Sequence, residues 1–175
     1  MKNILNHENF KNYQIFKELN SSETEEFIKK MEINNYSKKE IIIKEGDEGN
    51  SILFLLNGEL SISQALTLST VKHSSIDNRE KELIKLNSKN DDFSMGELAL
   101  FNSDKKRSAT VKAISNCKIA RLDFKDFFKI CNSNNSLGYK VMKNISEIIT
   151  GHLTESNHKV LKLTTAFSLL INNEN

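Results

Sequence analysis

The central part of the chain consists of short apolar runs separated by tight, glycine-containing turns. The runs Glu40–Lys44 and Ser51–Leu56 are rich in isoleucine and leucine, and the turn Glu45–Asn50 lies between them. Asn57-Gly58 follows, a dipeptide typical of a two-residue hairpin turn. Glu59–Ser63 then alternates polar and apolar residues, as expected of a strand with one face in solvent. Further runs of this kind are Glu82–Leu86, Ser108–Ile114 and Lys118–Leu122. This succession of short strands and turns favours a jelly roll or barrel.

Residues 95–111 combine groups that suit a small anionic ligand. Gly96 permits a tight turn and a close approach of the backbone. The four residues that begin with Glu97 can form one helical turn, whose free N–H groups would point at an anion. Arg107 supplies a planar, permanently charged guanidinium that suits a phosphate, whereas the Glu97 carboxylate accepts hydrogen bonds from hydroxyl groups. An acceptor and a cation in one pocket indicate a ligand that contains a sugar and a phosphate.

The same stretch resembles the phosphate-binding cassette of the cyclic-nucleotide-binding domain family. It reads Gly-Glu-Leu-Ala-Leu from Gly96 and Arg-Ser-Ala-Thr-Val from Arg107. The family pattern is Phe-Gly-Glu, small apolar residues, a loop, and Arg-small-Ala-Thr-Val. Met95 replaces the usual aromatic residue, and Lys106 replaces a proline that often precedes the arginine. The segment Glu45–Leu60 also resembles the front half of the family's β-roll, and its glycines are expected to be structural.

The resemblance implies a role for each matching residue. Glu97 would hold the ribose 2′-hydroxyl, and Arg107 would pair with the cyclic phosphate. Backbone N–H groups near Leu98 and Ala99, together with Ser108 or Ala109, would complete the anion site. The expected ligand-binding residues are therefore Gly96, Glu97, Leu98, Ala99, Arg107, Ser108 and Ala109. No catalytic or metal-ligating residue is expected.

The function that the resemblance implies is a cyclic-nucleotide-binding sensor or regulatory module without enzymatic activity. In the family, a threonine directly after the arginine often favours guanine. Ser108 has the same hydroxyl on a less constrained side chain, and several bacterial adenine-binding regulators resemble this sequence in having serine there. Cyclic AMP is therefore the expected ligand, with cyclic GMP or another anionic small molecule as alternatives. A further alternative is a scaffold that kept the roll and lost the ligand, although the presence of both Glu97 and Arg107 argues against it.

The expected fold class is α+β, mainly β: a double-stranded β-helix, or jelly roll, flanked by short N-terminal helices and by C-terminal helices. Residues 1–32 form the N-terminal helical segment, with apolar residues at three-residue steps between Phe10 and Leu19 and a capping box at Ser22–Glu25. Residues 33–122 form the β-roll, and residues 123–175 the C-terminal helices, the first of which Asp123 can cap. The stretch 64–78 lacks periodicity and is expected to be a long hairpin end or loop.

The C-terminal segment has apolar residues at helical spacing from Val141 to Ile171. One helix from Gly138 to Ile171 would be about 50 Å long at about 1.5 Å per residue. Gly151 could instead mark a break, after which a second helix doubles back. The second half of this segment would expose an apolar stripe, so we expect an interface there with an unidentified protein effector or, as a homodimer, with a second copy of the chain. In the matching family these helices cover the base and often carry dimer contacts or the coupling to an effector.

The overall composition argues against several other classes of protein. A net charge of +2 gives no dominant surface for nucleic acid or membrane, and no apolar run approaches the length of a bilayer span. The N-terminus does not resemble a secretory signal, so a cytoplasmic location with reduced Cys117 and Cys131 is expected. Transcription factors of the family continue into a helix-turn-helix, for which the residues before Asn175 leave no room. Output is therefore expected through a protein partner, or else the chain is part of something larger.

An enzyme is the alternative class, because jelly rolls also host cupin metalloenzymes. Those enzymes need clustered histidine and carboxylate ligands on facing strands. The chain has four histidines, and none forms a His-x-His pair. Ser108 has no histidine close to it in the sequence, so nucleophilic catalysis has no support either.

Overall fold

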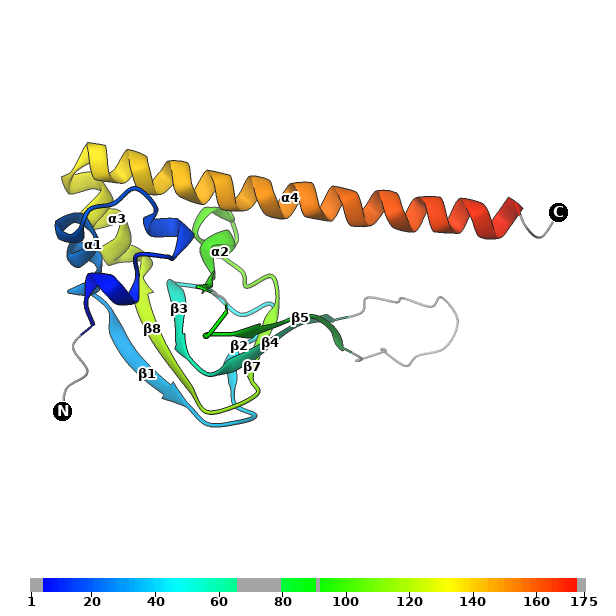
Figure 1. The fold of residues 1–175 in the computed structure, drawn as a ribbon, viewed down its shortest axis with the longest axis horizontal. Coiled ribbons are helices and arrows are strands. Elements are labelled where there is room, and N and C mark those ends of the chain that lie inside the picture. Colours follow the sequence, from blue (N-terminus) through cyan, green and yellow to red (C-terminus); the bar gives the residue numbers. More distant parts are fainter. Residues whose placement is uncertain (1–4, 66–79, 91, 173–175) are drawn as a thin grey trace.

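The structure is a computed structural model that describes residues 5–65, 80–90 and 92–172 (Figure 1). Two short 3₁₀ turns and one helix precede the strands, and two helices follow them. In chain order the elements are η1 (His7–Asn9), η2 (Gln14–Phe16), α1 (Ser21–Ile28), β1 (Glu32–Tyr36), β2 (Ile41–Ile43), β3 (Ser51–Asn57), β4 (Glu59–Ala65), β5 (Glu80–Asn87), β6 (Ser94–Met95), α2 (Glu97–Phe101), β7 (Thr110–Ala113), β8 (Cys117–Asp123), α3 (Phe124–Ser133) and α4 (Asn135–Asn172).

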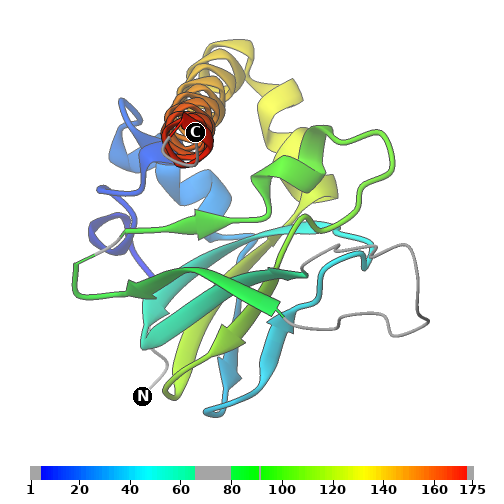
Figure 2. The same ribbon diagram turned by 90° about the vertical axis from the view of Figure 1, so that its right-hand side faces the viewer.

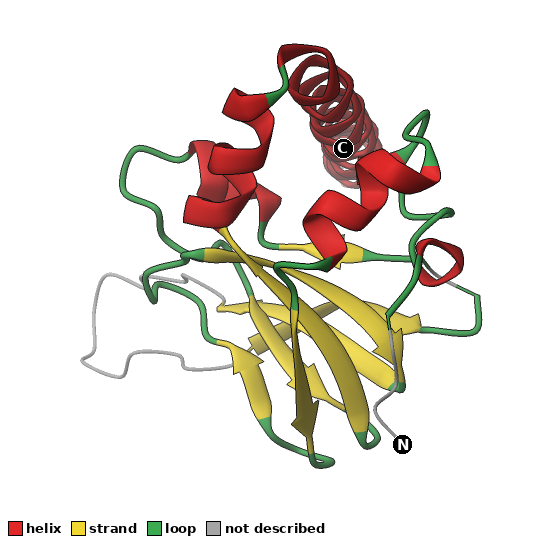
Figure 3. Ribbon diagram, turned by 90° about the vertical axis from the view of Figure 1, so that its left-hand side faces the viewer, coloured by secondary structure: helices red, strands yellow, loops and turns green. Residues whose placement is uncertain are grey.

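The strands form two four-stranded antiparallel sheets. One has the order β1-β8-β3-β6 and the other the order β2-β7-β4-β5. Figure 3 shows the helices gathered on one side of the strands. The expected α+β fold, a mainly β roll between helical ends, is therefore confirmed. Its division at residues 32 and 122 stays an expectation. Of the stretch predicted to be a long hairpin end or loop, Gln64 and Ala65 end β4, and residues 66–79 lie outside the described residues.

Asn57-Gly58 makes a tight turn, but the prediction of a hairpin is wrong. β3 pairs with β6 and β8, whereas β4 pairs with β5 and β7, so the dipeptide carries the chain from one sheet to the other. Gly58 has a φ of 105°, and a Cβ at this position would lie 2.6 Å from the carbonyl oxygen of Asn116. Glycine is required here both for its backbone conformation and for the close approach of the β7–β8 turn.

The N-terminal segment is less helical than predicted. Phe10 to Leu19 contains the 3₁₀ turn η2 rather than an α-helix, yet its apolar side chains are buried as expected. Their three-residue spacing suits a 3₁₀ turn, in which residues three apart lie on one side. The capping box lies two residues before the predicted position. The Asn20 side chain accepts from the Glu23 N–H at 2.9 Å, and the Glu23 carboxylate accepts from the Asn20 N–H at 2.9 Å.

The larger of two apolar clusters lies between the helices and the strands. Phe54 on β3 is at its centre, with ring centroids 5.6 Å from Phe10, 5.3 Å from Tyr13 and 5.3 Å from Phe16. The smaller cluster fills the interior of the roll. Cys117 and Cys131 are buried and unpaired, in agreement with the prediction of reduced thiols. This core holds the sheets and helices together around the site described below.

α4 is one helix of 38 residues, so the alternative of a break at Gly151 is wrong. A single glycine costs a helix only about 1 kcal/mol, which its neighbours can offset. Leu137, Val141 and Ile145 bury the first half against the domain. From residue 151 to residue 171 every side chain is exposed, and Figure 1 shows this half extending beyond the roll. None of the helices in the described part of the chain combines the length and apolarity that a bilayer span requires.

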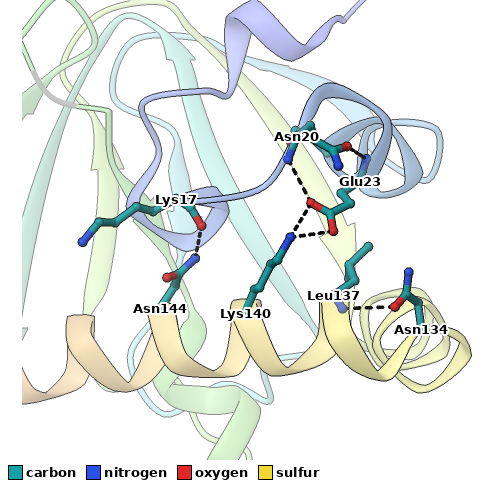
Figure 4. A network of polar contacts seen from close by, with 8 residues as sticks. Lys17, Asn20, Glu23, Asn134, Leu137, Lys140 and Asn144 are labelled. Atoms are coloured by element: carbon teal, nitrogen blue, oxygen red, sulfur yellow. Dashed lines mark hydrogen bonds and ion pairs between the residues drawn. The ribbon is translucent and has the colours of Figure 1, made fainter.

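Polar contacts fix the first half of α4 to the N-terminal segment (Figure 4). Asn144 is fully buried, and its amide donates to the carbonyl oxygens of Ile15 at 3.1 Å and Lys17 at 2.6 Å. Lys140 Nζ donates to both carboxylate oxygens of Glu23, at 2.8 and 3.0 Å, and this contact lowers the pKa of the Glu23 carboxyl. The placement of α4 therefore depends on the segment that precedes the roll.

Asp123 occupies the N-cap position of α3, as predicted, but its side chain makes no capping hydrogen bond. The carboxylate pairs with Arg121 instead, at 2.5 Å. Arg121 also donates to Asn50 Oδ1 at 3.1 Å. The end of β8 is therefore tied to the turn that precedes β3, next to the site.

Candidate functional site

The short helix α2 begins directly after Gly96, as the sequence predicted. Gly96 has a φ of 95° in the left-handed region, which strains any other residue. A Cβ here would lie 2.1 Å from Arg107 Nη1 and 2.8 Å from the Ser51 carbonyl oxygen. Gly96 is therefore required twice, for the turn into α2 and for the space that the Arg107 guanidinium occupies.

The turn at residues 45–50 is bonded to the backbone on both sides of Arg107. The Gly46 N–H donates to the Arg107 carbonyl oxygen at 2.9 Å, and the Arg107 N–H donates to the Asp47 carbonyl oxygen at 2.9 Å. The Gly49 N–H donates to the Lys105 carbonyl oxygen at 2.7 Å, and a Cβ at Gly49 would lie 2.7 Å from Arg107 Nε. Gly49 is therefore structural, as expected, and its lack of a side chain leaves room for the Arg107 guanidinium, a contact that the sequence alone does not indicate.

All seven candidate residues line one cavity of about 250 Å³. These are Gly96, Glu97, Leu98, Ala99, Arg107, Ser108 and Ala109. The apolar part of the lining includes Ile43, Ile62 and Val111, which lie on β2, β4 and β7. The long helix α4 contributes His152 to the lining of this cavity. Figure 2 looks along α4 from its C-terminal end and shows the helix passing above the strands. The cavity is thus bordered by α2, by the strands β2, β4, β5, β6 and β7, and by the long helix.

Glu97 and Arg107 are buried in this cavity with unused hydrogen-bonding capacity. Their exposed fractions are 4% and 9%. Glu97 Oε2 and Arg107 Nη1 have no hydrogen-bond partner in the described part of the chain, and Arg107 Nη2 donates to Ser51 Oγ at 3.2 Å. Burial raises the pKa of the Glu97 carboxyl and lowers the pKa of the Arg107 guanidinium. A buried polar group without a partner costs about 1–3 kcal/mol, so two of them in one cavity point to a ligand that supplies the partners.

Two polar pocket residues, Gln64 and His152, were not predicted from the sequence because they lie on distant elements. Gln64, near the end of β4, donates from Nε2 to the carbonyl oxygen of Ser108 at 2.6 Å and so fixes the backbone directly after Arg107. His152 reaches the cavity because α4 continues straight through Gly151. No local pattern marks either residue, since each depends on how the strands and α4 pack.

A larger cavity, of about 750 Å³, lies among the N-terminal segment, β1 and the start of β8. Its lining includes Tyr13, Tyr36 and Lys118, and none of the seven candidate residues. It contains no buried charged side chain, since the buried charged residues of the described chain are Glu97 and Arg107. Within the same described ranges, no three His, Cys, Asp or Glu side chains are grouped as metal ligands. The smaller cavity is therefore the better candidate site.

Comparison with known proteins agrees with this geometry. The model of the cyclic nucleotide-binding domain matches residues 33–134, which is more than half of the chain. The chain belongs to the cyclic nucleotide-binding domain family. This confirms the resemblance seen in residues 95–111 and, at the level of the family, the expectation of a regulatory cyclic-nucleotide-binding module.

Curated relatives include the cAMP-activated global transcriptional regulator CRP of Salmonella typhimurium. It is 27% identical over 108 residues, which are 62% of this chain and 46% of the relative. The chain thus spans about half the length of the curated relatives it matches. Because these relatives are transcriptional regulators, the expectation that there is no nucleic-acid partner finds no support in them.

Solved structures share the fold. The catabolite activator protein of Thermus thermophilus has a TM-score of 0.71 at 17% identity, and the alignment covers 86% of this chain and 63% of that one. The cAMP-bound PfPKA-R (141–441) has a TM-score of 0.57 at 32% identity, with coverage of 71% of this chain and 39% of that one. The architecture around the cavity is therefore that of the family.

Proposed function

We propose that this domain binds 3′,5′-cyclic AMP in the cavity between α2, the strands and α4, and that binding re-packs α4 against a partner. The observation that carries the proposal is the pair of unpartnered buried atoms, Glu97 Oε2 and Arg107 Nη1, in one cavity. A cyclic nucleotide would supply a partner for each: a ribose hydroxyl as a donor and a phosphate oxygen as an acceptor.

The cyclic phosphate binds Arg107 and the start of α2. The first N–H groups of a helix have no partner within it, so those of Leu98 and Ala99 are available to a phosphate oxygen. Burial of Arg107 strengthens its attraction to an anion because little water remains to screen the charge. Ser108 and Ala109 border the same end of the cavity, and Glu97 receives the ribose 2′-hydroxyl.

Cyclic AMP is favoured over cyclic GMP by Ser108 and by the relatives. The Salmonella relative is cAMP-activated, and PfPKA-R was solved bound to cAMP. Calorimetric titration with cyclic AMP, cyclic GMP and 5′-AMP, after removal of any co-purified nucleotide, tests the proposal. Saturable binding of cyclic AMP, weaker binding of cyclic GMP and none of 5′-AMP is the expected result. Equal binding of 5′-AMP would contradict a site built for a cyclic phosphate.

The exposed half of α4 pairs with α4 of a second copy of this chain. Leu153, Val160 and Phe167 follow one another at seven-residue steps, and Leu163 and Leu170 lie three residues after the last two. All five are more than half exposed. If Val160 is heptad position a, Leu163 is position d, and valine at a with leucine at d is typical of parallel two-stranded coiled coils. His152, which borders the cavity, is adjacent to the first residue of this stripe, so ligand and interface meet on the same turn of helix.

Sedimentation equilibrium tests this interface with two matched variants. Leu163→Glu places a charge within the stripe, and Leu161→Glu places one beside it on a side chain of similar exposure, 64% against 70%. We expect the wild type and L161E to form dimers and L163E to be monomeric. Cyclic AMP should tighten the wild-type dimer, because a ligand shifts an equilibrium only through its different affinity for the two states. If L163E and L161E dimerised equally well, the apolar stripe would not be the dimer interface.

A further inference from the structure

The Arg107 guanidinium lies in a slot with two glycine walls. A methyl group at Gly49 would lie 2.7 Å from Arg107 Nε, and one at Gly96 would lie 2.1 Å from Nη1. Neither distance leaves room for a side chain, so the guanidinium passes directly over two backbone positions. Such walls limit the path of the side chain, but they offer no hydrogen bond that would fix its rotation.

Ser51 provides the one side-chain hydrogen bond of this guanidinium within the described residues. Its Oγ accepts from Arg107 Nη2 at 3.2 Å, and Ser51 is 3% exposed at the start of β3. No carboxylate of the described chain forms an ion pair with Arg107, and the pKa of its guanidinium is lowered first by burial and second by the nearby charge of Arg121. The cation is thus oriented by a neutral acceptor, and no ion-pair partner in the described chain neutralises its charge.

This arrangement separates the two edges of the guanidinium. Nη2 is occupied by Ser51, whereas Nη1 has no partner and Arg107 borders the cavity. A carboxylate in place of Ser51 would orient the group equally well, but it would also neutralise the charge that an anion needs. A hydroxyl orients without neutralising.

We propose that Ser51 is the positioning residue for Arg107, holding Nη2 so that Nη1 is presented to the phosphate of the bound ligand. This inference rests on the proposed function for its effect on affinity. The orientation of Arg107 by Ser51 in the ligand-free protein does not depend on the proposed function. The two aspects can therefore be tested separately.

The affinity test is a double-mutant cycle of Ser51→Ala and Arg107→Gln, read by competition with a fluorescent cyclic AMP analogue. Loss of one hydrogen bond to a charged group predicts about tenfold weaker cyclic AMP binding for S51A. In the R107Q background the same substitution should change affinity less than twofold. Ser61→Ala, a half-buried serine on β4 that does not border the cavity, is the matched control and should bind as the wild type does. An equal loss from S51A in both backgrounds would show a merely structural effect and overturn the proposal.

The orientation test uses the ligand-free protein and needs no nucleotide. In ¹⁵N spectra of the arginine side chains, hindered rotation should keep the Nη1 and Nη2 signals of Arg107 separate in the wild type, with R107Q identifying them. In S51A the two signals should merge. Separate signals in both proteins would overturn the role of Ser51, whatever the ligand. If the wild type gave separate signals that merge in S51A but bound no cyclic nucleotide, the proposed function would fail while the positioning of Arg107 by Ser51 stood.

Discussion

Replacing Arg107 with glutamine should separate ligand binding from folding. Arg107 is 9% exposed, and its Nη1 has no partner in the described chain, so the ligand-free protein carries the cost of burying the guanidinium. Arg107→Gln removes that charge and should leave the ligand-free protein at least as stable as the wild type. The same change removes a charge-assisted contact of about 1.5–3 kcal/mol with the phosphate, which corresponds to about 10- to 150-fold weaker binding.

Thermal unfolding with and without cyclic AMP measures both effects together. A ligand at about 100 times its Kd stabilises a protein by about 2.7 kcal/mol, or about 5–11 °C in Tm for a domain of this size. At the same ligand concentration, a variant that binds 10- to 150-fold more weakly gains only about 0.3–1.4 kcal/mol, or about 1–6 °C. The exposed neighbour supplies the control, and Lys106→Gln should keep the wild-type shift. A wild-type shift in R107Q would refute the role of Arg107.

Two further predictions concern buried polar groups away from the phosphate. Because burial raises the pKa of Glu97 above its usual value of 4.5, the ligand-free wild type should be less stable than Glu97→Gln near neutral pH. The difference in unfolding free energy between the two proteins should shrink as pH falls through the raised pKa towards 4.5. Urea unfolding between pH 8 and 5 measures this difference. A difference that widened as pH fell would contradict the prediction. Asn144→Ala should destabilise the domain by about 2–4 kcal/mol, because it leaves the carbonyl oxygens of Ile15 and Lys17 without their donor. Unchanged urea midpoints would show that the contact of α4 with the N-terminal segment matters little.

The candidate site could be predicted from the sequence because most of it is local. Gly96 to Ala99 lie on one turn of helix, and Arg107 to Ala109 follow after one loop. A glycine, a carboxylate and an arginine at that spacing carry their chemistry without reference to the rest of the fold. Gly49, in the turn before β3, and Ser51, at the start of β3, contact Arg107, whereas His152 borders the cavity from α4. Their roles depend on contacts between segments far apart in the chain, which no local pattern encodes.

The predictions about the fold that were wrong failed for the same reason. Asn57-Gly58 correctly indicates a tight turn, but turn chemistry does not specify whether the flanking strands pair with each other or with strands elsewhere. The three-residue spacing from Phe10 to Leu19 correctly identifies the buried side chains, but a short segment can meet that spacing with 3₁₀ turns as well as with a helix. Gly151 is a weak helix breaker, and its neighbours on α4 outweigh it.

Diffraction from crystals grown with cyclic AMP tests the central claim most directly. The account predicts the nucleotide in the cavity lined by α2 and α4, with a phosphate oxygen within hydrogen-bonding distance of Arg107 Nη1 and the ribose 2′-hydroxyl donating to Glu97 Oε2. Nucleotide found instead in the larger polar cavity beside Tyr36 and Lys118, with Arg107 and Glu97 still unpartnered, would contradict it.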